Sequence, residues 1–125
     1  MYLVDTNVFL EILLAQPKKV ACKEFLNTNV DDLSISDCSL HWIGTVLWQN
    51  NNVDTFHAFV KDVIPRVEIL TLREDKYQAF ININKDLDLD FHDTYQYQVA
   101  IEHDLVIVTL NRQFEIAEEI RVLIL

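Results

Sequence analysis

Glycine is nearly absent from this sequence, whose 125 residues include a single glycine, Gly44, and two prolines. A nucleotide site of the P-loop or Rossmann kind needs several glycines, because its backbone must approach the phosphates closely. The sequence therefore excludes both kinds of site. Turns and helix caps must instead come from Asn and Asp, whose short side chains hydrogen-bond to the nearby backbone.

Cysteines and long apolar runs are also scarce. Cys22 and Cys38 are the only cysteines, and neither lies among the further thiols or histidines that a zinc cage requires, so we expect both to be small packing residues. The longest apolar runs, such as residues 106–108, are far shorter than the ~20 residues that cross a bilayer. Met1 leads directly into a strand-like segment without the features of a signal peptide, which predicts a cytoplasmic protein with no membrane partner.

Positive charge is under-represented: ten Lys and Arg stand against twenty Asp and Glu, a formal net charge of −10. Phosphate binding draws on positive charge, so the overall field of this chain does not attract nucleic acid. A nucleic-acid substrate would need local cations or a bound metal, whereas a basic partner protein would suit the charge directly. Charge alone leaves both kinds of partner open.

Hydrophobic residues make up 50% of the chain, which is enough for a buried core. Strand-like apolar runs alternate with helical spacing over the whole length, which predicts one domain at residues 1–125 with a parallel sheet covered on both faces. The expected strands are residues 2–4, 33–35, 67–70 and 105–109, with 121–125 as a fifth strand or an apolar tail. The expected helices are residues 5–14, 17–26, 37–47, 53–63 and 73–85, one that begins at Asp90, and a short one that begins at Asn111, with Tyr77, Phe80 and Ile81 facing inward.

Polar side chains follow two of the expected strands at the point where each strand ends. Asp5 comes directly after the first strand, Asn111 closely follows strand 105–109, and Asp93 lies in the first turn of the helix before that strand. Ligands of such sheets bind beyond the carboxyl ends of the strands, so Asp5 and Asn111 converge if those two strands are neighbours. Clustered carboxylates predict a site for Mg²⁺ or Mn²⁺ and metal-dependent hydrolysis.

Each of these residues also has a structural interpretation that stays open. Asp5, Asp90 and Asn111 are good helix N-caps. Asp90 followed by Asp93 resembles a capping arrangement with a favourable charge at the helix start. The acidic residues in the segment 86–90 fit a solvated rim.

The four histidines are scattered along the sequence. His57 fits an exposed helix face, and His103 fits the end of a helix, where a positive charge is favourable. His92 adjoins Asp93 and is placed to touch a substrate. His41 is considered with the family resemblance below.

Two stretches of the sequence resemble the PIN domain family. Residues 1–10, MYLVDTNVFL, are similar to the opening of PIN domains, whose first strand ends in Asp-Thr-Asn or a close variant. Residues 90–100, DFHDTYQYQVA, and 105–111, LVIVTLN, resemble their third acidic helix and fourth strand, and residues 35–41 lie where their second motif falls. The resemblance covers the chain from end to end and implies a three-layer α/β/α sandwich with a central parallel sheet of about five strands.

PIN domains are commonly Mg²⁺- or Mn²⁺-dependent ribonucleases, many of them toxins of VapBC-type toxin–antitoxin pairs, and dimers are common. The resemblance therefore implies an RNA substrate, a Mg²⁺ or Mn²⁺ cofactor, an antitoxin protein as partner and a homodimer. It also implies that Asp5 and Asp93 are catalytic, metal-binding carboxylates. Thr6 and Asn7 would support Asp5, and Thr109 would be a polar contact beside the site.

Two acidic positions of the family are replaced in this sequence. The second motif normally offers a Glu near the position of His41, and the fourth normally places an Asp where Asn111 stands. The fourth motif often has another Asp two residues later, where this sequence has Gln113. Asp37 or Asp90 compensates in part if either side chain points inward, and His41 is itself able to coordinate metal. Because each carboxylate adds to the attraction of a hard cation, we expect weak metal binding and a PIN-type endoribonuclease with a depleted acidic site.

Two other functions remain as alternatives. A PIN fold without catalysis would serve as an RNA- or protein-binding module, and Asp5→Asn would then leave its function intact. A phosphoryl-transfer enzyme of the haloacid dehalogenase or receiver type fits less well. Residues 4–8 faintly resemble the Asp-x-Asp opening of the former, but Asn7 replaces the second acid and no lysine follows the later strands.

Overall fold

The computed structural model describes residues 1–125, apart from the side chain of Asn84. Five strands form one sheet in the order β3-β2-β1-β4-β5, and every pair of neighbours is parallel. The strands are β1 (Tyr2–Val4), β2 (Leu33–Ser36), β3 (Glu68–Leu70), β4 (Val106–Thr109) and β5 (Val122–Ile124). The parallel five-stranded sheet is confirmed, and the end of the chain is a strand, not an apolar tail.

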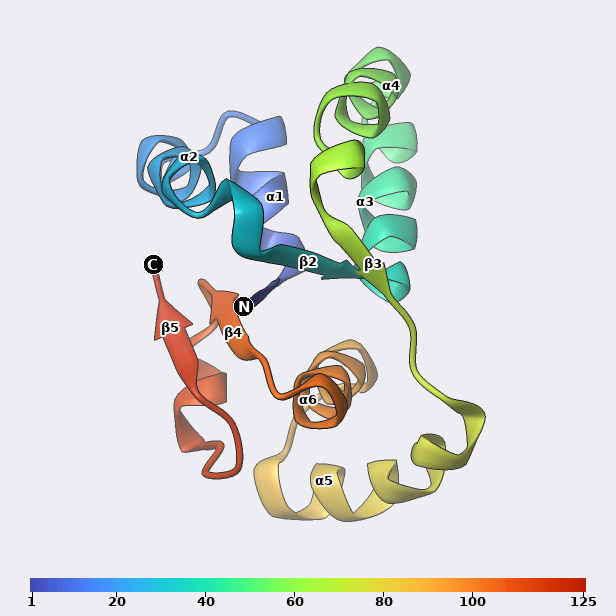
Figure 1. Cartoon of the computed structure of the whole chain (residues 1–125). Helices are drawn as coiled ribbons and strands as arrows, with labels where there is room; N and C mark the ends of the chain where they lie inside the picture. Colours follow the sequence, from blue (N-terminus) through green and yellow to red (C-terminus); the bar gives the residue numbers. More distant parts are fainter.

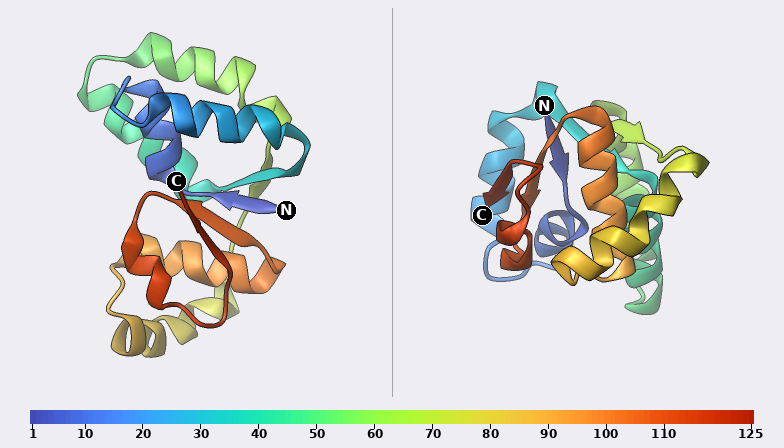
Figure 2. Two further views of the ribbon diagram at one scale, coloured as in Figure 1. Left: turned by 90° about the vertical axis from the view of Figure 1, so that its left-hand side faces the viewer. Right: turned by 90° about the horizontal axis from the view of Figure 1, so that it is seen from below.

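Helices cover both faces of the sheet, which confirms the three-layer α/β/α sandwich (Figures 1 and 2). One face carries α1 (Thr6–Leu13), α2 (Lys19–Thr28), α3 (Asp37–Gln49) and α4 (Val53–Asp62), and the other carries α5 (Phe80–Leu87) and α6 (Phe91–His103). Four short 3-10 helices connect them: η1 (Val30–Asp32), η2 (Ile64–Arg66), η3 (Glu74–Ala79) and η4 (Arg112–Ile116).

The central strand β1 contributes to two separate hydrophobic cores. Leu3 packs with Val99 and Ile107 on the α6 side, whereas its neighbour Val4 packs with Val8 and other residues on the α1 side. Successive side chains of a strand point to opposite faces, so a strand buried on both faces is apolar at every position. This explains why the central strands carry continuous apolar runs.

The expected helix at residues 73–85 differs from the observed one. The chain forms η3 first and then α5, and Ile81 is 68% exposed where an inward position was expected. In α5, Phe80, Ile83 and Leu87 pack against the core, at the three- and four-residue spacing that places side chains on one helix face. Ile81 lies off that face, and Tyr77 is also partly exposed, so the expected inward register was wrong for these two residues.

No helix among the described residues is long and apolar enough to cross a membrane.

Candidate functional site

Strands β1 and β4 are neighbours in the sheet, which meets the condition for the predicted convergence. Their register pairs Val4 with Val108, and the backbone N–H of Asp5 donates to Val108 O over 2.9 Å. Asp5 and the residues that follow Thr109 therefore emerge at the same edge of the sheet. Helix α6 begins beside this edge and places Asp93 there.

Asp5 is 2% exposed and accepts four hydrogen bonds. Its Oδ1 accepts from the Thr6 backbone N–H (2.8 Å) and from Gln96 Nε2 (3.0 Å). Its Oδ2 accepts from Thr109 Oγ1 (2.8 Å) and from Asn7 Nδ2 (3.3 Å). Asp5 is thus the N-cap of α1, as the structural interpretation held, and it is also the centre of a polar network that reaches α6 and β4.

Asn7 joins the start of α1 to the end of β4. Its Nδ2 donates to Thr109 Oγ1 over 3.2 Å, and its Oδ1 accepts from the Leu110 backbone N–H over 3.1 Å. Thr109 Oγ1 also accepts from the Asn111 backbone N–H over 3.0 Å. These bonds fix the loop after β4 against α1, so the polar groups of the sheet edge have one defined arrangement.

Asp93 is a second carboxylate at this edge. Its Oδ2 accepts from Asn111 Nδ2 over 3.1 Å, and its backbone N–H donates to Asp90, the N-cap of α6. Burial, followed by the negative charges of Asp5 and Asp90, raises the pKa of Asp93 from an ordinary 3.8 to about 7, against the hydrogen bond from Asn111, which lowers it. Among the described residues, no Lys or Arg forms an ion pair with Asp5 or Asp93.

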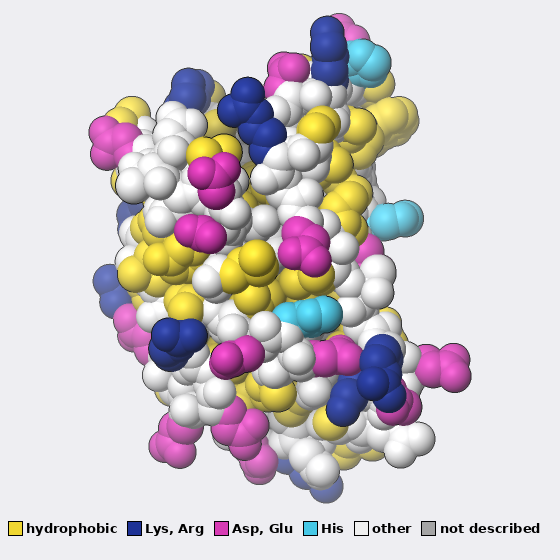
Figure 3. Space-filling model, in the orientation of Figure 1, with side chains coloured by type: hydrophobic (Ala, Val, Ile, Leu, Met, Phe, Trp, Pro, Cys, Tyr) yellow, Lys and Arg dark blue, Asp and Glu magenta, His cyan; other side chains and the backbone are white. Residues whose placement is uncertain are grey.

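The two carboxylates share a small pocket of about 160 Å³. Its lining consists of Asp5, Thr6, Asn7, Leu10, Trp42, His92 and Asp93. On the face drawn in Figure 3, Lys and Arg side chains are scattered among acidic ones and do not gather into a basic patch.

His41 does not join the predicted site. It is exposed on α3 and lines a separate apolar groove with Trp48 and Phe56, while the α3 residue in the carboxylate pocket is Trp42, which is 53% exposed. An α-helix turns about 100° per residue, so adjacent positions face different directions. The α3 side chain that lines this pocket is therefore an indole and not an imidazole.

Asp37 and Asp90 do not reach the pocket either. Asp37 Oδ1 accepts from the Tyr95 hydroxyl and from the Cys38 backbone N–H, and Asp90 caps α6 from an exposed position. Partial compensation by either residue is therefore not seen. Within the part of the chain that the structure describes, no group of three or more His, Cys, Asp or Glu is close enough to hold a metal ion.

Gln96 is a functional candidate that the sequence did not single out. It is fully buried, its amide donates to Asp5 Oδ1 and to Ser39 Oγ (2.9 Å), and its carbonyl accepts from Ser36 Oγ. Gln96 lies three residues after Asp93 on α6, so both face the same way. The three-residue spacing from Asp93 was the signal in the sequence that could have identified Gln96. An amide on the inward face of a buried helix needs polar partners, and Asp93 already marked that face as polar.

His92, on α6, contacts two other helices at the site, α1 and α3. Its Nε2 lies 2.9 Å from Thr6 Oγ1 on α1, its Nδ1 lies 3.3 Å from Cys38 Sγ on α3, and its ring stands against Trp42 with centroids 6.5 Å apart. Cys38 is therefore a polar contact of the site and more than a packing residue. Cys22, in contrast, is fully buried among apolar side chains, as expected.

The donor set fits a hard divalent cation in kind, but it is sparse. Mg²⁺ is often held by only one or two carboxylates together with waters and substrate phosphate. A carboxylate has about four lone-pair directions, and Asp5 already uses four for protein donors. A cation at Asp5 must displace one of them, and the 3.3 Å bond from Asn7 is the longest. Asp93 Oδ1 accepts no hydrogen bond from any described residue and is open to a ligand.

Solved structures share this fold at low sequence identity. VapBC from Salmonella typhimurium bound to DNA aligns with a TM-score of 0.79 at 23% identity, over 98% of this chain and 96% of that one. FitAcB from Neisseria gonorrhoeae gives 0.81 at 20% identity, over 98% and 96%. VapC20 of Mycobacterium tuberculosis, a sarcin–ricin loop cleaving toxin, gives 0.67 at 14% identity, over 86% and 87%. These likenesses establish the fold.

No curated protein sequence matches the chain. A family model does, and it spans residues 2–120. The model is that of the PIN domain, and its match includes Asp5, Asp93, Thr109 and Asn111, the polar residues that β1, β4 and α6 bring to one edge of the sheet. The chain belongs to the PIN domain family.

Proposed function

We propose that the chain is a single-domain, metal-dependent endoribonuclease of the PIN type that uses Mg²⁺ or Mn²⁺ at Asp5 and Asp93. One observation carries the proposal: two carboxylates from distant parts of the sequence line one pocket, and no described Lys or Arg pairs with either. Burial, and then the nearby negative charges, raise the pKa of Asp93, and a bound cation would remove that repulsion.

The residues of the chain would position the reactants. A divalent cation would act as a Lewis acid: it would lower the pKa of an attacking water and neutralise charge that develops on the phosphodiester. Asp5 is held in place by its four hydrogen bonds, and Asn111 orients Asp93. Asp93 Oδ1 is the oxygen open to the cation. The polar side chain of His92 and the indole of Trp42 line the pocket and would contact the nucleotide.

RNA is the substrate that we propose, and the cytoplasm is the place of action. A sarcin–ricin loop cleaving toxin among the structures of the same fold supports RNA over other phosphodiesters. The net charge of −10 opposes binding of any polyanion, so the affinity for RNA should depend strongly on the cation in the pocket.

An antitoxin is the protein partner that we propose. The toxin–antitoxin complexes among the structures of the same fold, VapBC and FitAB, support such a partner. The acidic surface of this chain indicates that the partner segment is basic.

A homodimer is also part of the proposal, and the apolar groove on α3 and α4 is the surface that suits it. Its lining is Leu40, His41, Gly44, Thr45, Trp48, Gln49 and Phe56, with no Asp or Glu. In a chain of net charge −10, an interface without acidic residues brings two copies together with the least repulsion.

The test is cleavage of mixed-sequence RNA in Mn²⁺, in Mg²⁺ and in chelator, with Asp5→Asn beside the unmodified chain. We expect cleavage that requires metal and falls at least ~100-fold in the variant, because a carboxylate at the metal is lost. Asp54→Asn is the matched control, since Asp54 is exposed on α4, and it should cleave normally. Undiminished cleavage by Asp5→Asn would contradict the proposal.

A second candidate function is an RNA- or protein-binding module without catalysis. The observation that favours it is the full set of protein donors around Asp5, together with Trp42 in the wall of the pocket. In that case Asp5→Asn binds its ligand as the unmodified chain does, and binding in chelator equals binding in Mn²⁺. Filter binding of RNA under both conditions separates the two functions.

A further inference from the structure

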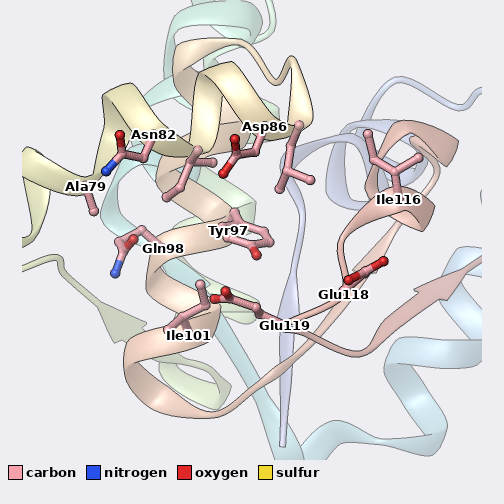
Figure 4. Close-up of a pocket in the computed structure, with 11 residues that line it drawn as sticks. Ala79, Asn82, Asp86, Tyr97, Gln98, Ile101, Ile116, Glu118 and Glu119 are labelled. Atoms are coloured by element: carbon pink, nitrogen blue, oxygen red, sulfur yellow. The ribbon is translucent and has the colours of Figure 1, made fainter.

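A cavity of about 610 Å³ lies away from the carboxylate pocket, between α5, α6 and the segment that joins η4 to β5 (Figure 4). It shares no lining residue with the pocket of Asp5 and Asp93. Its volume is within the range of ~300–1,000 Å³ that is usual for small-molecule sites.

Three carboxylates line the cavity. Asp86 comes from α5, and Glu118 and Glu119 come from the segment before β5. All three residues are exposed, and none forms an ion pair with a Lys or Arg among the described residues. The cavity therefore has a concentrated negative charge that the described part of the chain does not balance.

Two buried polar side chains also line the cavity and have no partner. Tyr97 is 4% exposed and Gln98 is 7% exposed, and neither side chain forms a hydrogen bond with any described residue. Figure 4 shows the Tyr97 hydroxyl on the side of Glu119, with Asp86 on the opposite side of the ring. Polar groups of largely buried side chains are normally hydrogen-bonded. The polar atoms of these two remain accessible from the cavity, so a ligand there can supply their partners.

The electrostatics of Tyr97 agree with this arrangement. Burial raises the pKa of its hydroxyl, and the charges of Glu119, Asp86 and Glu118 raise it further, in that order. Each carboxylate is thus close enough to act on the same hydroxyl. A ligand that carries several positive charges would interact with all three acids, and one of its cationic groups could lie on the face of the Tyr97 ring.

The lining fits an extended organic cation better than a metal ion. The acids are too far apart for one ion, since no group of three or more His, Cys, Asp or Glu among the described residues could hold a metal. Apolar side chains, including Ile83 and Ile101, lie in the same lining. Carboxylates and apolar side chains in one lining suit a ligand in which ammonium groups are separated by methylenes.

We propose that this cavity binds a linear polyamine, with ammonium groups at Asp86, Glu118 and Glu119 and methylenes along Ile83 and Ile101. The Tyr97 hydroxyl and the Gln98 carbonyl accept hydrogen bonds from the ammonium groups. A lysine side chain of another protein offers the same chemistry with a single charge, so the number of charges distinguishes the two sources.

The test is calorimetric titration of spermidine into the full chain at low salt. We expect saturable 1:1 binding, weakened about threefold by Asp86→Asn or Glu119→Gln and about tenfold by both together, since partly exposed ion pairs contribute modestly. Tyr97→Phe removes only the hydroxyl and keeps the ring in the core, and we expect about threefold weaker binding.

Glu115→Gln is the matched control, because Glu115 is an exposed acid of η4 that pairs with Arg112 and does not line the cavity. A loss of affinity in Glu115→Gln equal to that in Glu119→Gln would show unspecific attraction to an acidic chain and would overturn the proposal. Nα-acetyl-lysine amide, whose only charge is the ε-ammonium group, should bind at least ~10-fold more weakly than spermidine. Equal affinity for the two would overturn the assignment to a polyamine.

Discussion

Asn111 donates from its Nδ2 to Asp93 Oδ2 over 3.1 Å, and this bond links the loop after β4 to the first turn of α6. The resemblance to PIN domains leads us to expect an acid at this position. An amide here donates a hydrogen bond to Asp93 where a carboxylate would repel it, and it brings no charge to a cation.

Restoring the acid should strengthen metal binding. In Asn111→Asp a third carboxylate joins Asp5 and Asp93, and we expect Mn²⁺ affinity to rise at least ~10-fold by calorimetry, because each carboxylate adds to the attraction of a hard cation. The melting temperature without metal should fall, because a donor to Asp93 becomes a like charge. Asn27→Asp, which adds the same charge at an exposed position of α2 away from the site, is the control. Equal Mn²⁺ affinity in Asn111→Asp and the unmodified chain would contradict this role.

The stability of the metal-free chain should fall as the pH rises from 4 to 7. The pKa of Asp93 is about 7 in the folded chain and an ordinary 3.8 when unfolded, so between these values the unfolded state binds fewer protons and gains stability with rising pH. The contribution of this one group is about 1–3 kcal/mol, reduced by its partial exposure. Urea unfolding across this pH range should show that decline, and Asp93→Asn should lack it. If the stability of Asp93→Asn falls equally over this pH range, the decline comes from other titratable groups and not from Asp93.

Removing the amide of Gln96 should destabilise the fold. Gln96→Leu has a similar volume but leaves Asp5 Oδ1, Ser36 and Ser39 each without a buried partner. A loss of about 1–3 kcal/mol is expected, because buried polar groups that lose their partners keep their desolvation cost. Urea unfolding measures it, with Gln78→Leu as the control at an exposed position of η3. Unchanged stability would show that the network is not needed for the fold.

Placing a charge in the groove on α3 and α4 should separate the homodimer. In Trp48→Glu an exposed indole of the groove becomes a carboxylate, which would face its own copy across a twofold interface. Analytical ultracentrifugation should show a dimer for the unmodified chain and a monomer for the variant. Val20→Glu adds the same charge at an exposed apolar position on α2 and should stay dimeric. Sedimentation of the unmodified chain as a monomer would contradict the proposed homodimer.

The sheet and the convergence of Asp5, Asp93 and Asn111 were predictable because they depend on patterns of short range. A buried parallel strand reads as a continuous apolar run, and the residue after its end lies at the ligand edge. The sequence predicted this convergence only on the condition that β1 and β4 are neighbouring strands. The backbone hydrogen bond from Asp5 N–H to Val108 O shows that the condition is met.

Other features depend on helix rotation, which short motifs do not define. The sequence gives no means to decide whether His41 or Trp42 faces Asp5, because one residue changes the direction by about 100°. The same ambiguity misplaced Ile81 on α5. Gln96 was missed for a different reason: its partners Ser36 and Ser39 are distant in sequence, and only the packing of α6 against α3 and β2 brings them together.

If Asp5 and Asp93 hold the cation that supports RNA cleavage, the rate of cleavage in Mn²⁺ should follow the number of carboxylates at positions 93 and 111. We predict that Asn111→Asp is fastest, the unmodified chain intermediate and Asp93→Asn at least ~100-fold slower than the unmodified chain, with no cleavage in chelator. A folded Asp93→Asn variant that cleaves at the rate of the unmodified chain, or cleavage that persists in chelator, would contradict the account.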